Sequence, residues 1–385
     1  MSIVERKKEG LMSHKKIVVA GHIALDITPA FENTSRQSFS DILKPGKLVN
    51  VGAARISNGG SVSNTGLALH RLGADVTLVG KTGKDLFGEI VRKQVKEAGC
   101  RMDMILSDTD ETSYTIVIAP KGCDRAFLHD SGCNNTFTYD EMRMETIRDA
   151  EYFHFGYPTI MRKFYEGDGE MLVQMYREMK QKGLVTSLDL SLVDPDSEAG
   201  KCDWEKILGR VLPYVDFFVP SIEEVGYMLD KKRYDRWQED AGGEEIISVL
   251  SLKQDILPIA EKALSFGCRA VMVKCGAAGM YLRTSSEEDM RKVDADLKGW
   301  GEQKIFQKSY VPERVLSASG AGDTSIAAFL KCVMEGESPE RSLEYAAATG
   351  ACCVTTYDTI SGLLDLEELR KKIDSGWEQQ SLLMS

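Results

Sequence analysis

The sequence of 385 residues has few of the features that stabilise small secreted or membrane proteins. Its nine cysteines are scattered without a CxxC pair, and its five histidines stand at no zinc-ligand spacing. No apolar run approaches the roughly 18 residues that a membrane-spanning helix needs. These absences argue against disulfide scaffolds, zinc modules and membrane spans. We therefore expect reduced thiols in a cytoplasmic protein.

Basic residues are scarce relative to acidic ones. Lys and Arg total 48 against 59 Asp and Glu, which gives a formal net charge of −11. Such a surface repels phosphate backbones and anionic lipids, so we expect neither nucleic acid nor a membrane as a partner. With 43% hydrophobic and 28% charged residues, the composition is that of a globular chain that can bury a large core without a staple.

Short apolar runs that alternate with helix-period segments indicate the fold class. The runs expected as strands are 17–21, 76–80, 152–155, 184–188, 217–219 and 270–273. Amphipathic stretches separate them, which predicts an α/β fold with a mainly parallel central sheet flanked by helices. Residues 231–254 and 283–308 are charged and strand-poor, and we interpret both as surface excursions.

Two segments without helical period indicate a second, smaller β-layer. One is residues 31–57, and the other is residues 110–130. In the latter, the runs 114–118 and 126–128 flank Pro120-Lys121-Gly122 and predict a hairpin. Exposed edges of such a sheet invite pairing, so we expect a symmetric homodimer through this layer.

These segments define the expected domain boundaries. We expect residues 1–14 to be a flexible tail. The main α/β domain is expected to comprise residues 15–30, 58–109 and 131–375, with residues 31–57 and 110–130 as a β-lid.

The loop Gly320-Ala321-Gly322-Asp323 opens a segment of helical period that runs to Glu335. Small residues at a helix start let unpaired backbone amides approach an oxyanion, and the helix dipole favours that charge. A carboxylate beside a developing anion is what phosphoryl transfer to a hydroxyl requires. The structural alternative is an N-cap aspartate on a tight turn. We expect the helix dipole to keep the pKa of Asp323 low.

A second glycine-rich loop precedes another helical segment. Gly59 and Gly60 allow close approach of the backbone, and Asn64 offers a donor and an acceptor one turn later. This arrangement suits a polyhydroxylated ligand. The alternative is a turn followed by a capping asparagine.

Together these motifs resemble those of the PfkB, or ribokinase-like, carbohydrate kinases. The pattern Gly59-Gly60-x-x-x-Asn64 with residues 80–88 is similar to the N-terminal signature of that family, and the loop 320–323 to its C-terminal signature. The similarity covers most of residues 16–365. It implies a Rossmann-type α/β sandwich with a small β-sheet lid, which uses ATP and Mg²⁺ to phosphorylate a hydroxyl of a small sugar or a nucleoside.

The resemblance also implies roles for individual residues. Asp323 matches the catalytic base of the family, and the implied anion hole consists of the amides of Gly320, Ala321 and Gly322. The implied substrate contacts are Asp26, Gly59, Gly60 and Asn64. On the nucleotide side the resemblance implies Lys274, Gly276, Gly279 and Ser221. Glu224 matches the acid that organises Mg²⁺.

Some positions depart from the family pattern. Ser317-Ala318-Ser319 stands where an acid and a threonine are usual, Ser221 replaces an asparagine, and the turn at Lys274 lacks a threonine. These departures keep open the alternative of a catalytically silent sugar-binding protein. The GAN-like stretch 132–134 favours a sugar over a nucleoside as substrate.

A few polar residues near strand ends have two interpretations each. Asp189 and Asp194 are candidates for contacting nucleotide or metal, but we favour solvated loop carboxylates. His22 and His154 border predicted strands, and we interpret them as core or pocket-wall residues rather than catalysts.

Overall fold

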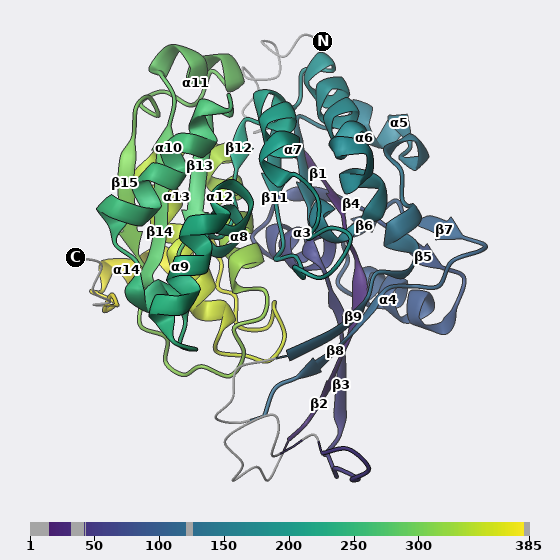
Figure 1. Cartoon of the computed structure of the whole chain (residues 1–385). Coiled ribbons are helices and arrows are strands. Elements are labelled where there is room, and N and C mark those ends of the chain that lie inside the picture. Colours follow the sequence, from purple (N-terminus) through teal and green to yellow (C-terminus); the bar gives the residue numbers. More distant parts are fainter. Residues whose placement is uncertain (1–14, 32–41, 43, 121–125, 381–385) are drawn as a thin grey trace.

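The computed structural model describes residues 15–31, 42, 44–120 and 126–380 (Figure 1). The expected tail at residues 1–14, most of segment 32–43, and Lys121 and Gly122 of the expected hairpin turn lie outside the described residues.

A nine-stranded sheet forms the centre of the main body, in the order β15-β14-β13-β12-β11-β10-β1-β4-β6 (Figure 1). Its parallel strands are β1 (Lys16–Gly21), β4 (Asp75–Val79), β6 (Arg101–Met102), β10 (Tyr152–Gly156), β11 (Val185–Asp189), β12 (Phe217–Phe218) and β13 (Ala270–Lys274). The predicted mainly parallel sheet is confirmed, and each predicted strand corresponds to one of these.

The interpretation of two charged segments as surface excursions was wrong in part. Strands β14 (Gly279–Thr284) and β15 (Lys304–Lys308) extend the sheet as an antiparallel edge. Because β15 lies at the edge and stays partly exposed, its sequence KIFQK keeps polar residues and lacks the apolar run of a central strand. Residues 231–241 form a helix that is anchored by the buried ring of Trp237.

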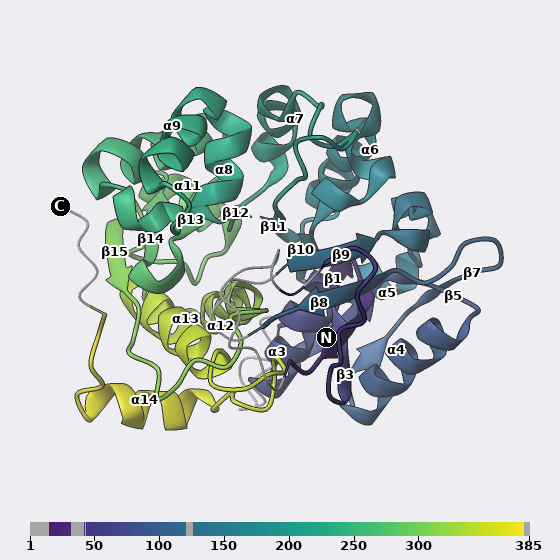
Figure 2. The same cartoon turned by 60° about the horizontal axis from the view of Figure 1, so that its bottom comes forward.

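Helices cover both faces of the sheet (Figure 2). One face carries α3 (Ser61–Arg71), α12 (Ala321–Glu335), α13 (Pro339–Cys353) and α14 (Leu366–Asp374). The other carries α6 (Arg162–Gln181), α7 (Trp204–Val211), α8 (Ile222–Leu229) and α10 (Leu257–Ser265). The remaining helices are α4 (Leu86–Glu97), α5 (Met144–Arg148), α9 (Lys231–Ala241) and α11 (Glu287–Val293).

The sheet separates two hydrophobic cores, and strand β1 shows why. Ile17 and Val19 point into the core under α3, α12 and α13, whereas Val18 and Ala20 point into the core under α6 to α8. A strand buried on both faces needs apolar residues at every position, which explains the continuous apolar runs in the sequence.

A second sheet of four strands projects from the main body (Figure 1). Its order is β3 (Ala54–Gly59), β2 (Ala24–Pro29), β8 (Tyr114–Ile118) and β9 (Ala126–Asp130). The antiparallel pairing of β8 with β9 confirms the predicted hairpin. The placement of residues 24–30 in the main domain was wrong, because β2 pairs with β3 and β8 rather than with β1. Two further short strands, β5 (Lys81–Gly83) and β7 (Ile105–Ser107), pair with each other.

Candidate active site

Polar residues gather where the central parallel strands end. Tyr157 follows β10, Asp189 ends β11, Ser221 follows β12 and Lys274 ends β13. Because the carboxyl ends of parallel strands share one edge of the sheet, these residues lie along that edge, beside the start of α12. Ligands of open α/β sheets bind at this edge.

Asp323 lies in the first turn of α12 and is only 3% exposed. Asn64 Nδ2 donates to its Oδ2 at 3.0 Å, and Thr65 Oγ1 donates to its Oδ1 at 3.4 Å. The hydroxyl of Tyr157 donates to both carboxylate oxygens at 2.9 Å. Side chains from the start of α3 and from the residue after β10 therefore hold the Asp323 carboxylate in place.

The expectation of a low pKa for Asp323 was wrong. Burial raises its pKa, although the Lys274 ammonium and the donors Tyr157 and Asn64 oppose that shift. The helix dipole does not dominate, because the carboxylate is removed from water and other carboxylates, among them Glu224, lie near it. A raised pKa makes Asp323 a stronger base than a solvent-exposed aspartate.

Lys274 and Asp189 form a buried ion pair at the edge of the sheet. The distance from Lys274 Nζ to Asp189 Oδ1 is 2.6 Å, and the two side chains are 12% and 1% exposed. Burial alone would lower the pKa of Lys274, but Asp189 and Glu224 outweigh burial and raise it, so the ammonium stays charged. Our preference for Asp189 as a solvated loop carboxylate was wrong, because β11 holds it inside the protein.

The turn before α12 is open next to this lysine. Gly320 has φ 74°, in the left-handed region, and starts the helix. A Cβ on Gly322 would lie 3.4 Å from Lys274 Cδ and 3.6 Å from Lys274 Nζ. The ammonium thus lies beside the turn whose first-turn amides have no helical acceptor. Of these amides, Ala321 N already donates weakly to the carbonyl of Ala318, at 3.4 Å.

Ser221 and Glu224 cap the N-terminus of α8 reciprocally. Ser221 N donates to Glu224 Oε2 at 2.7 Å, and Glu224 N donates to Ser221 Oγ at 3.2 Å. Glu224 is 8% exposed, and its charge acts on Asp189, Lys274 and Asp323. The cap thus occupies Oε2 of Glu224.

Asp26 reaches the site from β2 of the small sheet. A Cβ on Gly59 would lie 2.2 Å from Asp26 Oδ1, so only glycine lets the carboxylate lie against β3. Burial and the charge of Asp323 together raise the pKa of Asp26 to about 6, although a hydrogen bond from Thr115 opposes the shift. Gly60, with φ 83°, packs on the ring of His22.

His22 and His154 are both buried, as predicted for core or pocket-wall residues. Burial lowers the pKa of His22 well below its ordinary value, and it lowers that of His154 to about 3. Both rings are therefore neutral at pH 7, which agrees with a role in packing rather than in catalysis.

The two glycines after β13 differ in their surroundings. A Cβ on Gly279 would lie 2.0 Å from the carbonyl oxygen of Gln307, so the pairing of β14 with β15 already explains this glycine. Gly276, with φ 53°, has open space where a side chain would stand. Of the two, Gly276 is the better candidate for approach by a ligand.

Tyr157, the residue that contacts Asp323 most closely, was not predicted from the sequence. Its position directly after the buried run 152–156 was the available signal, since residues that follow parallel strands line the ligand edge. Thr359 was missed as well. Its methyl group lies where a Cβ of Gly320 would stand, and its hydroxyl donates to Asn64 Oδ1 at 3.4 Å.

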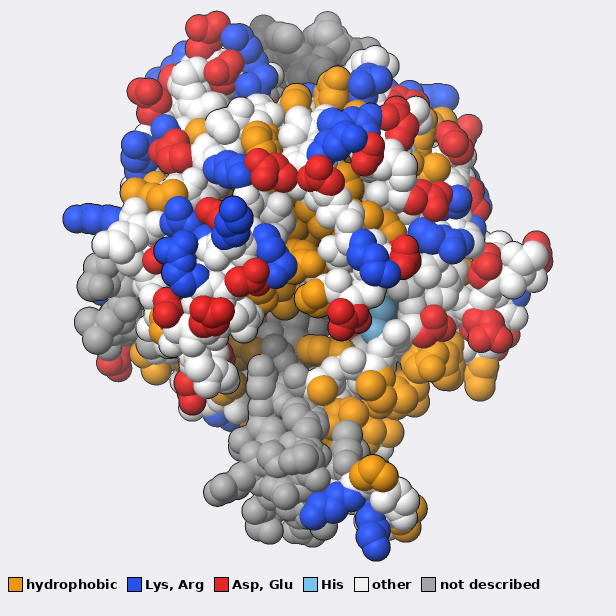
Figure 3. Space-filling view, in the orientation of Figure 1, with side chains coloured by type: hydrophobic (Ala, Val, Ile, Leu, Met, Phe, Trp, Pro, Cys, Tyr) orange, Lys and Arg blue, Asp and Glu red, His pale blue; other side chains and the backbone are white. Residues whose placement is uncertain are grey.

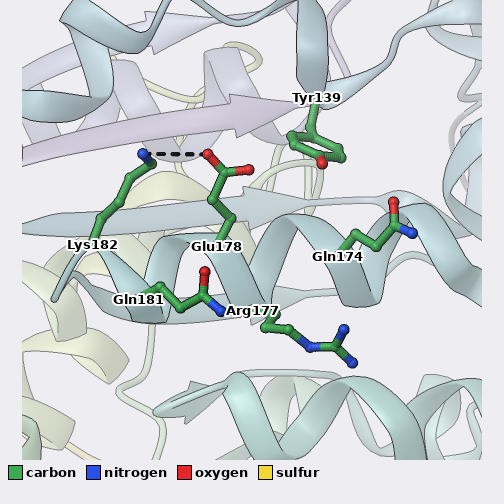
Figure 4. A pocket seen from close by; sticks show the side chains of 6 residues that line it. All are labelled: Tyr139, Gln174, Arg177, Glu178, Gln181 and Lys182. Atoms are coloured by element: carbon green, nitrogen blue, oxygen red, sulfur yellow. Dashed lines mark ion pairs between the residues drawn. The ribbon is translucent and has the colours of Figure 1, made fainter.

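A hollow of about 460 Å³ on the described residues lies elsewhere. Figure 4 shows its lining by Tyr139, Gln174, Arg177, Glu178, Gln181 and Lys182. These residues belong mostly to the last turns of α6, which lead into the amino end of β11, the opposite edge from Asp323. The hollow is therefore separate from the site.

The described residues lack two features, a membrane-spanning helix and a ready-made metal cluster. No helix among them is sufficiently long and apolar to cross a bilayer. Within the same residues, no three His, Cys, Asp or Glu side chains are arranged to hold a metal ion by themselves.

Comparison with known proteins gives matches along most of the chain. A family model described as pfkB family carbohydrate kinase matches residues 14–366. An uncharacterized sugar kinase of Archaeoglobus fulgidus is 23% identical over 300 residues, which cover 77% of this chain and 98% of the relative.

Solved structures show the same fold. Ribokinase of Arabidopsis thaliana, complexed with ribose and ATP, aligns with a TM-score of 0.65 at 21% identity, over 93% of this chain and 98% of the other. Fructokinase of Xylella fastidiosa with bound ATP aligns with a TM-score of 0.68 at 19% identity, over 94% and 99%. These similarities confirm the expected α/β fold with its small additional sheet.

Proposed function

Because the chain belongs to the pfkB family of carbohydrate kinases, we propose that it transfers the γ-phosphoryl group of ATP to a hydroxyl of a small sugar. One observation carries this proposal. A buried carboxylate, Asp323, lies at a helix start whose first-turn amides lack helical acceptors and which adjoins the ammonium of Lys274. That combination serves a hydroxyl losing its proton next to a phosphoryl group gaining negative charge.

In the proposed reaction the acceptor oxygen forms a bond to the γ-phosphorus, and the bond from phosphorus to the bridging oxygen of ADP breaks. The hydroxyl proton passes to Asp323. The amides of Gly320, Ala321 and Gly322 and the ammonium of Lys274 stabilise the charge on the transferred group. Lys274 suits this role because Asp189 keeps it charged and fixed beside Gly322.

The small sheet is proposed to hold the sugar. Asp26 lies against Gly59, and the charge of Asp323 acts on it across the site. As a carboxylate it accepts hydrogen bonds from sugar hydroxyls. Gly59 and Gly60 are proposed to line the sugar site with their backbone, while the space of their missing side chains is taken by Asp26 and His22. Asn64 orients Asp323 while keeping a second amide N–H for the substrate.

The residues at the edge of the sheet fit ATP and Mg²⁺. A side chain at Gly322 would fill the space beside Lys274 that a phosphate needs, and Gly276 leaves open space on the nucleotide side. Gly279 follows Gly276 in the same turn, and Ser221 forms a β-bridge with Lys274. Asp189 Oδ2 is buried without a partner among the described residues, and the oxygen of Glu224 outside the cap is proposed to serve the site. Carboxylates of this kind hold Mg²⁺ through its water ligands. When bound, the metal neutralises phosphate charge.

The proposed metal role of Glu224 has a direct test. Glu224→Gln keeps the cap on α8, because an amide oxygen still accepts from Ser221 N. We expect this variant to need a higher Mg²⁺ concentration for half-maximal rate, whereas Glu223→Gln, the neighbouring acid, serves as the control. A titration of Glu224→Gln that overlays the wild type rules out the assignment.

The kinase proposal is tested by ADP release from ATP and Mg²⁺ across a panel of acceptors. The panel contains a pentose (ribose), a hexose (fructose), a pentose phosphate, an aldonic acid and a nucleoside. We expect turnover with a sugar. Turnover with the nucleoside alone supports the alternative of a nucleoside kinase. Ligand-induced thermal stabilisation without ADP release supports the alternative of a silent sugar-binding protein.

We also propose a homodimer through the small sheet. Hydrophobic side chains gather over this sheet in Figure 3, and Ile56, Phe127 and Leu128 are 48%, 53% and 56% exposed. Exposed apolar strands of this kind bind a second copy. Light scattering at micromolar concentration is expected to give twice the chain mass, and Leu128→Lys to give one chain mass. A monomeric wild type rules out the dimer.

The cysteines support a reducing compartment. All eight cysteines in the described part of the chain are free, and seven of them are buried. We propose the cytoplasm, where such thiols stay reduced.

A further inference from the structure

Tyr157 stands at the point where β10 meets the start of α12. Its hydroxyl lies 2.9 Å from Asp323 Oδ1 and 2.9 Å from Asp323 Oδ2. Equal distances mean that the hydroxyl lies on the midline between the two oxygens, on the side where the carboxylate lone pairs converge. Of the groups that contact Asp323, Tyr157 is therefore the one that engages both oxygens.

The backbone of Tyr157 is strained in a way that fixes this contact. Its φ is 66°, in the left-handed region that bulky residues avoid. Tyr157 N donates to the carbonyl of Asp189 at 3.2 Å, and Pro158 follows directly. Because a following proline favours extended backbone instead, the hydrogen bond to β11 holds a conformation that the local sequence opposes. Strained backbone that the surroundings enforce is typical of functional sites.

We propose that Tyr157 is a positioning residue for phosphoryl transfer, which holds the carboxylate of Asp323 in one plane and aims its Oδ1 at the acceptor hydroxyl. This inference rests on the proposed function, in which Asp323 is the base. Oδ2 accepts from Tyr157 and from Asn64 at 3.0 Å, so its lone pairs are occupied. Oδ1 shares Tyr157 and has only the long contact of 3.4 Å from Thr65. Oδ1 is the oxygen with capacity for the proton of the acceptor.

The contact also affects the protonation of Asp323. A donor to the ionised form favours that form, so the Tyr157 hydroxyl lowers the pKa of Asp323 against the effect of burial. Other groups act on the same carboxylate from every neighbouring element. They are Asp26 on β2, Asn64 and Thr65 on α3, Asp189 on β11, Glu224 on α8, Lys274 on β13 and Cys353 on α13. Removing the Tyr157 hydroxyl leaves all of these in place.

The first test compares Tyr157→Phe with Tyr152→Phe. Tyr152 begins the same strand, and its hydroxyl also donates to an aspartate, Asp294, at 2.6 Å. We measure kcat and kcat/KM from pH 5 to 9 with the best acceptor from the panel. In Tyr157→Phe the rising acid limb is expected to move up by about one pH unit, and kcat at pH 7 to fall about tenfold with KM for ATP kept. In Tyr152→Phe both are expected to match wild type. Asp26 titrates in all three proteins, so its contribution cancels in the comparison.

The second test needs no substrate. Urea unfolding at pH 7 is measured for wild type, Tyr157→Phe, Asp323→Asn and the double variant. We expect Tyr157→Phe to cost more stability in the wild-type background than in the Asp323→Asn background, because hydrogen bonds to charged groups are the stronger ones.

The outcomes separate this inference from the kinase proposal. If Asp323→Asn is inactive but Tyr157→Phe moves the acid limb by less than about 0.3 unit, the positioning role is wrong and the base assignment stands. Additive effects of the two substitutions in urea also overturn the positioning role. If Asp323→Asn keeps wild-type turnover, the base assignment fails and the positioning role fails with it.

Discussion

The main sheet and the small sheet bury their residues differently, and each contributes one side of the candidate site. In β1 of the main sheet five of the six residues are buried, with side chains in two cores. In β9 of the small sheet four of the five residues are exposed. A strand whose two faces pack against two hydrophobic cores cannot shift without opening both cores. A half-exposed sheet can shift at a lower cost in free energy.

The carboxylates of the site also differ between the main sheet and the small sheet. On the main-sheet side Asp323 has the donors Asn64, Thr65 and Tyr157, and Asp189 has the ammonium of Lys274. On the small-sheet side Asp26 is half-buried and has a donor in Thr115, but burial outweighs this donor and raises the pKa to about 6. We infer that the main sheet fixes the groups for phosphoryl transfer, while the small sheet supplies the contacts that select the sugar.

The largest expected effect is on turnover, from a change on the main-sheet side. Asp323→Asn keeps the shape but removes the base, so kcat is expected to fall about 10²–10⁴-fold with substrate affinity nearly kept. Asp26→Asn, the corresponding change on the small sheet, is expected to act mainly through KM for the sugar. Steady-state kinetics of both variants check this division. If Asp323→Asn keeps more than about a tenth of wild-type kcat, general-base catalysis of this size is excluded.

The next largest effect is on stability, again on the main-sheet side. Lys274→Met leaves Asp189 buried without its partner, and breaking a buried pair in this way costs about 3–5 kcal/mol. Urea unfolding measures the loss. The matched control is Lys180→Met, which breaks the ion pair with Asp216 at the other end of the sheet, where the lysine is 31% exposed.

The double variant Lys274→Met/Asp189→Leu sharpens this result. It removes both charges, so most of the stability is expected to return while turnover stays low. A Lys274→Met variant as stable as the control contradicts the assignment of a buried, paired Asp189.

The same division explains what the sequence could predict. The central strands were predictable because burial on two faces demands apolar runs, as in residues 152–155. The edge strand β15 was not, because partial exposure removes that signal. The loop 320–323 was recognisable since its small residues and acid are adjacent in sequence.

Contacts between segments that are far apart in the chain could not be predicted from the sequence. The pair of Asp189 with Lys274 joins residues 85 positions apart, and Tyr157 meets Asp323 across 166 positions. Asn134 of the GAN-like stretch is fully buried and bonds both backbone groups of Ile23, at 3.3 and 2.9 Å. Its role in joining β1 to β2 explains this asparagine without reference to the substrate.

The smallest expected effect comes from Asp26→Asn on the small sheet, which is expected to raise the stability of the protein in a pH-dependent way. The pKa of Asp26 is about 6 in the folded protein, against about 3.9 in an unfolded chain. Between these values the unfolded chain has released the proton that the folded protein keeps, so stability falls as the pH rises from about 4 to 6. Above that range the full penalty for the ionised Asp26 remains. Asp26→Asn removes it, so the melting temperature is expected to rise by about 2 °C at pH 7.5 and to stay unchanged at pH 4.

Asp85, whose pKa is lowered rather than raised, provides the control for Asp26→Asn. Burial would raise the pKa of Asp85, but Gly88 N and Thr112 N donate to its carboxylate at 2.7 and 2.6 Å and lower the pKa instead. Its contribution to stability is present above the unfolded pKa and is lost as the pH falls through the lower folded value. Asp85→Asn is therefore expected to lower the melting temperature at pH 7.5, opposite in sign to Asp26→Asn. If Asp26→Asn also destabilises at pH 7.5, Asp26 is held by native donors as firmly as Asp323, and the division between a fixed and an adaptable side of the site is wrong.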